Sequence, residues 1–73
     1  MSRLPVCSGA EAIRAFERAG WKYDRQKGDH VMLFKPGVVR VLTVPLHKEV
    51  AKGTLRRLIR DAGLTVEEFS EKL

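Results

Sequence analysis

Two segments with helical patterns enclose three short segments with strand patterns, and this order limits the folds open to the chain. The first helical segment begins at Ser8, whose spacing to Glu11 is that of a capping box. Gly20 lies where a helix stop is expected. Between them, apolar residues recur at intervals of three and four, namely Ala12, Ile13, Phe16 and Ala19. This spacing predicts an amphipathic helix with one buried stripe.

A second helical segment lies near the C-terminus and is followed by a third, shorter one. The apolar stripe of the second consists of Leu55, Leu58, Ile59 and Ala62, followed by a glycine. Thr65 and Glu68 form another capping box, and Leu64 with Phe69 has the spacing of a hydrophobic staple. A short last helix is therefore predicted from Val66 to about Lys72.

The residues between the helices favour β-structure. Strands are predicted at residues 21–26, 30–35 and 38–44, separated by turns at Lys27-Gly28-Asp29 and Pro36-Gly37. Such short connections imply an antiparallel meander. We expect the first strand to be half-buried, with Trp21 and Tyr23 on one face. A loop from Pro45 to Gly53 then leads to the second helix.

The predicted fold is α+β: a two-layer sandwich of a three-stranded antiparallel sheet with helices on one face, within a single domain spanning residues 1–73. The order α-β-β-β-α-(short α) matches the double-stranded-RNA-binding-domain fold. Alternation along the second strand separates His30, Met32 and Phe34 from Val31, Leu33 and Lys35. The alternation alone does not decide which set faces the helices.

Composition narrows the classes of function. Fourteen Lys and Arg residues against nine Asp and Glu give a net charge of +5, which favours a polyanionic partner such as nucleic acid or an acidic protein. No apolar run approaches a membrane span and no signal peptide is evident, so we expect a cytoplasmic protein without a membrane partner. The lone Cys7 rules out an internal disulfide. One cysteine and two histidines without a close ligand pair predict no structural metal, and we expect no cofactor.

The stretch from Lys27 to Lys35 is the candidate for chemistry. A glycine turn delivers His30 to the start of an apolar strand, and histidine exchanges a proton near neutral pH. Lys27, Lys35 and Arg40 are the nearest candidates to hold a phosphate. The alternative is that His30 is an ordinary strand residue and the lysines only keep the sheet soluble.

Two further features stay open between function and structure. His47, in the loop before the second helix, is either the second member of an acid–base pair or a loop-fixing residue; we favour the latter, because nothing in the sequence places it near His30. The second helix carries a basic ridge, defined by Lys52, Arg56, Arg57 and Arg60. This ridge is either a nucleic-acid contact or a solvated face. Trp21 looks like a core residue, whereas Tyr23 suits either the core or base stacking.

The sequence resembles the HicA (YcfA-like) toxins, small mRNA interferases of toxin–antitoxin pairs. The segments that carry the resemblance cover nearly the whole chain: Ala15-Phe16, Ala19-Gly20-Trp21, Gly28-Asp29-His30, Val44-Pro45-Leu46-His47, Gly53-Thr54-Leu55-Arg56-Arg57-Leu58-Ile59, Ala62-Gly63-Leu64-Thr65 and Glu68-Phe69. Their order and spacing in a chain of this length are specific, although no single segment is.

The resemblance implies the same fold, cleavage of mRNA, and neutralisation by a HicB antitoxin that covers the active site. The family's glycine-serine-histidine motif maps onto Gly28-Asp29-His30, which implies that His30 is catalytic. Asp29 departs from the family serine: its carboxylate can orient the imidazole but also repels a phosphate. The alternatives are a non-catalytic RNA-binding module with the same fold, or a member of the family that has lost its activity.

Overall fold

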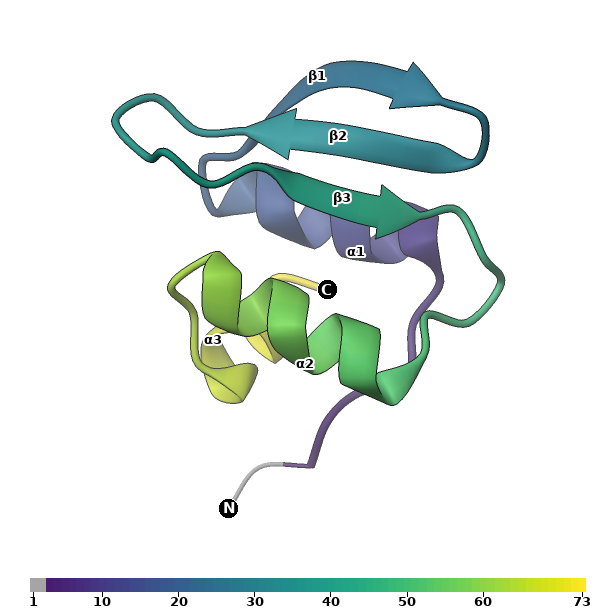
Figure 1. Ribbon diagram of the computed structural model, residues 1–73. Coiled ribbons are helices and arrows are strands. Elements are labelled where there is room, and N and C mark those ends of the chain that lie inside the picture. Colours follow the sequence, from purple (N-terminus) through teal and green to yellow (C-terminus); the bar gives the residue numbers. More distant parts are fainter. Residues whose placement is uncertain (1–2) are drawn as a thin grey trace.

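The computed structural model describes residues 3–73, and its helices and strands follow the predicted order (Figure 1). Met1 and Ser2, which belong to the predicted domain, lie outside the described residues. The elements are α1 (Gly9–Arg18), β1 (Lys22–Lys27), β2 (His30–Phe34), β3 (Leu42–Pro45), α2 (Lys52–Asp61) and α3 (Val66–Glu71). The strands form one antiparallel sheet in the order β1-β2-β3. The predicted α+β architecture is thus confirmed.

The local helix signals act as predicted. Ser8 and Glu11 form a complete capping box at α1, and Thr65 and Glu68 form another at α3. The pKa of Glu11 lies below its ordinary value, because its carboxylate accepts a hydrogen bond from the Ser8 backbone N–H and is further stabilised by the Ser8 hydroxyl. Gly20 follows α1 with a φ of 100°, in the left-handed region that residues other than glycine rarely adopt.

The helices cover one face of the sheet, and the core lies between the two layers (Figure 1). Val31 and Leu33 of β2 face the helices, opposite Val44 and Leu42 of β3, and all four are buried. The rings of Phe16 and Phe69 pack with their centroids 5.0 Å apart, which joins α1 to α3 beneath the sheet. The set that contains His30 therefore lies on the open face.

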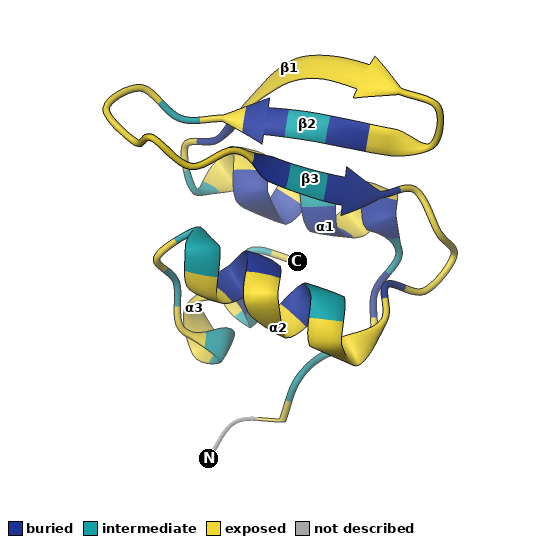
Figure 2. Cartoon of the chain, in the orientation of Figure 1, coloured by how far each residue is buried: buried dark blue, intermediate teal, exposed yellow. Residues whose placement is uncertain are grey.

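The prediction of a half-buried first strand is wrong. All six residues of β1 are exposed, whereas β2 buries alternate positions and β3 buries every residue except Thr43 (Figure 2). Trp21 is buried at 2% exposure but precedes the strand, and Tyr23 is 55% exposed. β1 and β3 are both edge strands, but α1 and α2 both pack against β3, whereas of the described helices only α1 packs near β1. The polar residues of β1 therefore remain in contact with water.

The third strand is shorter than the predicted range of residues 38–44 and runs from Leu42 to Pro45. Pairing with β2 begins only at Leu42, which lies opposite Leu33. Before that point the chain turns at Pro36-Gly37, where the Val38 N–H donates to the Lys35 carbonyl at 3.0 Å and Gly37 has a φ of 83°. β-branched residues favour a strand only where a partner strand lies beside them, and residues 38–41 have none.

The second helix also begins earlier than predicted, at Lys52, so Gly53 lies inside α2 and not in the preceding loop. Ala51 occupies the N-cap without a side-chain hydrogen bond. Among the described residues, no helix has the length and apolar character needed to span a membrane.

We expect Gly9→Ala to destabilise the fold, because a Cβ at this buried position would lie 2.0 Å from the Pro45 carbonyl oxygen. Overpacking against the backbone should lower the free energy of unfolding by roughly 1–3 kcal/mol. Gly53→Ala is the matched control, since a Cβ there meets no atom within 4 Å inside an exposed helix turn. Urea denaturation measures both, and equal stability of the two variants would contradict the close approach.

Candidate functional site

The turn between β1 and β2 positions the candidate catalytic residue. Lys27 and His30 form the last pair of the hairpin, so Gly28 and Asp29 are its two turn residues. Gly28 has a φ of 60° and Asp29 does not have a positive φ, which is the pattern of a type II′ turn. The Gln26 amide donates to the Gly28 carbonyl at 2.9 Å and braces the turn. His30 therefore begins β2 in a fixed orientation.

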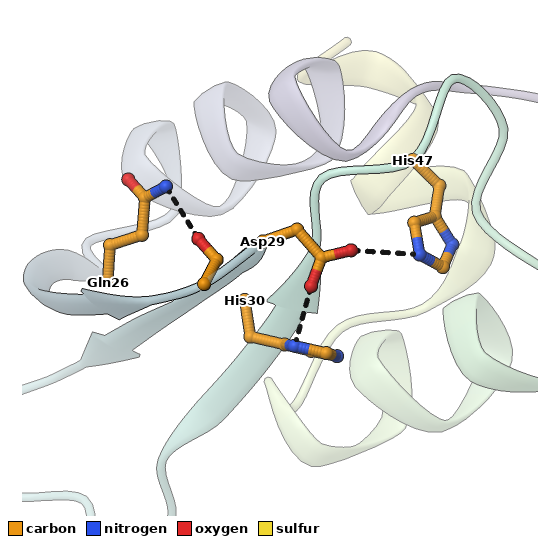
Figure 3. A network of polar contacts seen from close by, with 5 residues as sticks. Gln26, Asp29, His30 and His47 are labelled. Carbon is orange, nitrogen blue, oxygen red and sulfur yellow. Dashed lines mark hydrogen bonds and ion pairs between the residues drawn. The ribbon is translucent and has the colours of Figure 1, made fainter.

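Asp29 lies between the two histidines of the chain (Figure 3). Its Oδ1 is 3.0 Å from Nδ1 of His30, and its Oδ2 is 3.5 Å from Nε2 of His47. The first distance is that of a good hydrogen bond, whereas the second is that of a looser charge contact. All three side chains are more than half exposed, so solvent and a substrate can reach them.

Three main-chain hydrogen bonds hold His47 at this turn. The Leu46 N–H donates to the Asp29 carbonyl at 2.6 Å, the Gly9 N–H to the His47 carbonyl at 2.9 Å, and the Val50 N–H to the Cys7 carbonyl at 2.9 Å. The loop after β3 is thus fastened to the hairpin turn on one side and to the start of α1 on the other.

This arrangement fixes how His30 can act. A carboxylate only accepts hydrogen bonds, so a hydrogen bond across the 3.0 Å contact with Asp29 requires the proton to lie on Nδ1 of His30. In the neutral ring Nε2 then holds a free lone pair, which is the form a general base requires. Among the described residues, no three His, Cys, Asp or Glu side chains are grouped so that they could hold a metal ion. The geometry suits proton transfer.

The basic residues predicted beside His30 separate in the structure. Lys27 lies directly opposite His30 on the same face of the sheet. Lys35 lies at the far end of β2, where its amino group binds the Ala19 carbonyl at the end of α1. Arg40 precedes β3 at the end remote from His30, roughly 15 Å away along the strand direction. Of these three cations, only Lys27 neighbours the imidazole, which corrects the expected grouping.

Arg40 instead joins the basic ridge of α2. It lies 3.5 Å from Asp61, and Arg60 lies 3.9 Å from the same carboxylate. An open pocket of about 400 Å³ lies here between the start of β3 and α2. Its lining consists of Arg40, Val41, Thr43, Arg57, Leu58, Arg60 and Asp61. Lys52 and Arg56 continue the exposed ridge for about 12 Å back toward the His47 loop.

Sequence reasoning missed the proximity of His47 to His30. The available signal was the meander itself: in an antiparallel sheet, the end of the third strand returns beside the start of the second. Pro45 indeed pairs with His30, which leaves His47 only two residues away. The ring of His47 contacts Asp29, and this contact both fixes the loop and places the ring beside the turn that carries His30. The geometry is therefore compatible with both roles, acid–base catalysis and fixation of the loop.

Comparison with known proteins agrees with the resemblance seen in the sequence. A family model described as the HicA toxin of bacterial toxin–antitoxin matches residues 9–64, from the start of α1 to just beyond α2. The matched segment includes Asp29, His30 and His47. No curated protein matches the chain.

Asp29→Ala should change the tautomer of His30. Without the acceptor at 3.0 Å, the neutral ring loses the interaction that keeps the proton on Nδ1 and shifts toward the Nε2–H form. Ring ¹⁵N chemical shifts, recorded at a pH where the imidazole is neutral, report this population. Asp24→Ala, which removes an exposed carboxylate from the same hairpin, is the control. An unchanged His30 spectrum in Asp29→Ala would show that Asp29 does not set the tautomer.

Proposed function

Because the chain belongs to the HicA toxin family, we propose that it is the toxin of a type II toxin–antitoxin system and inhibits translation by cleaving mRNA without a metal ion. The observation that carries this proposal is the pairing of an exposed imidazole, His30, with an orienting carboxylate, Asp29, and a neighbouring cation, Lys27. RNA supplies its own nucleophile, so these groups meet the needs of the reaction.

The proposed step is transesterification within the RNA. Nε2 of His30 takes the proton of the 2′-hydroxyl, whose oxygen attacks the adjacent phosphorus and forms a new O–P bond. The bond from phosphorus to the 5′-oxygen breaks, and that oxygen takes a proton from His47 in its charged form. The products are a 2′,3′-cyclic phosphate and a 5′-hydroxyl. His47 receives this role because Asp29 holds its ring beside the same turn as His30.

The basic residues divide between two tasks in this proposal. Lys27, opposite His30, stabilises the charge that develops on the phosphate oxygens. Arg40 and the basic ridge of α2 contact the RNA backbone away from the bond that is cleaved. Lys35 is left out of this role, because its amino group already binds the Ala19 carbonyl. Binding that rests on phosphate contacts should weaken steeply as salt is added.

The partner in this proposal is a HicB-like antitoxin that covers the site. A toxin family of toxin–antitoxin systems implies an antitoxin. The net charge of +5 and the exposed basic ridge suit an acidic surface on that partner as well as RNA. The action belongs to the cytoplasm, where mRNA is translated.

His30→Ala should abolish RNA cleavage in EDTA. Loss of a general base typically costs 10²–10⁴-fold in rate, so we expect a decrease of about this size with a structureless RNA as substrate. Gel analysis of the products measures the rate, and analysis of the 3′ end identifies the cyclic phosphate. Glu71→Ala is the control, because it removes an exposed carboxylate from α3, away from the hairpin that carries His30.

Two outcomes would contradict the proposal. Binding without cleavage by both wild type and His30→Ala would identify a non-catalytic RNA-binding module. A linear 3′-hydroxyl product would exclude the transesterification step. In cells, growth arrest on expression should be relieved by His30→Ala or by co-expression of the antitoxin.

A further inference from the structure

The open face of the sheet carries a set of cations that sequence alternation does not reveal. The register pairs Lys22 with Phe34, Arg25 with Met32 and Lys27 with His30. Residues directly opposite in an antiparallel pair point to the same face. The three cations of β1 therefore lie on the face of His30, and all three are exposed.

A β-bulge causes this clustering. The register shifts between Tyr23 and Arg25, so Asp24 has no partner on β2. In a regular strand Lys22 would share its face with Asp24 and Gln26, and Arg25 would point toward the helices. One inserted residue reverses the two sets beyond it, which brings Arg25 and Lys27 to the open face.

The same face offers an aromatic surface. Phe34 is 39% exposed and is the last residue of β2, about 13 Å along the strand from His30, which is the first. Arg25 lies between these two ends, where its Nε approaches the Met32 sulfur at 3.3 Å. Tyr23, the aromatic residue first considered for stacking, is paired with Leu33 and belongs to the other face. Among the paired residues of the described sheet, none on the open face is acidic.

We infer that this face, defined by Lys22, Arg25, Lys27 and Phe34, binds single-stranded RNA and leads it to His30. The inference rests on the proposed function, whose substrate must approach His30 from the open side. Cations spaced along a strand suit successive phosphates, and an exposed ring suits an unpaired base. An exposed ring can stack only on a base that is not already stacked within a duplex, which favours a single strand.

The test is binding of an oligonucleotide of about eight residues, within the site sizes of small single-strand binders, with every 2′-hydroxyl methylated so that it cannot be cleaved. The first variant changes Lys22, Arg25 and Lys27 to Gln. The control changes Arg3, Arg14 and Lys72 to Gln, which removes the same charge from the helical side of the molecule. Circular dichroism checks that both variants are folded.

We expect the sheet-face variant to bind at least thirtyfold more weakly than the control. Loss of three phosphate contacts should also reduce the slope of log affinity against log salt by about 2. A charge-preserving variant, Lys22→Arg with Lys27→Arg, should retain binding. Phe34→Leu keeps an apolar side chain but removes the ring, and it should weaken binding about tenfold with an unchanged salt slope.

The inference would be overturned if the variant with Lys22, Arg25 and Lys27 changed to Gln bound RNA as tightly as the control. It would also be overturned if this variant lost affinity for the antitoxin but kept its affinity for RNA. In the latter case the face is a protein-docking surface. Failure of the proposed function gives a different result: the methylated RNA binds to the sheet face, yet unmodified RNA is not cleaved. A variant of the basic ridge of α2 that alone removes the salt dependence would move the RNA site to that helix.

Discussion

The turn residue Asp29 connects the parts of the chain on which the site depends. Its carbonyl accepts the Leu46 N–H, and its carboxylate contacts both histidines. The main-chain hydrogen bond holds the loop after β3 beside the hairpin turn, and the Asp29 carboxylate can therefore contact His47 in that loop. If the turn were displaced, His30 would lose its orienting partner and His47 its place beside the turn.

The small size of the domain leaves one face of the sheet without a covering layer. Three helices cover the other face, and every residue of β1 is exposed. The face that carries His30 therefore remains open without the need for a cleft. The bulge at Asp24 gives this face its charge, since it turns Arg25 and Lys27 toward the same side as Lys22. A local irregularity thus sets the charge of the open face.

The sequence predicted what depends on neighbours along the chain. Capping boxes at Ser8 and Thr65, helix stops at glycine and the order of elements all follow from local spacing, and the structure confirms them. The sequence did not predict the features that depend on pairing between strands. The length of β3, the exposure of β1 and the separation of Arg40 from His30 depend on strand register and on which helices pack beneath each strand. No local sequence pattern indicates the bulge either, so the position of Arg25 on the face of His30 was not predicted.

Asp29, at the position where the resemblance to the family implies a serine, affects the charge of the site. A carboxylate repels a phosphate, but here each of its oxygens faces an imidazole, and Lys27 flanks the turn. Protonation of either histidine compensates the negative charge where a phosphate would approach. A serine hydroxyl has one oxygen to offer, whereas the carboxylate has two and reaches both rings. The carboxylate therefore offers one oxygen to each histidine, which couples the proposed base and acid through a single residue.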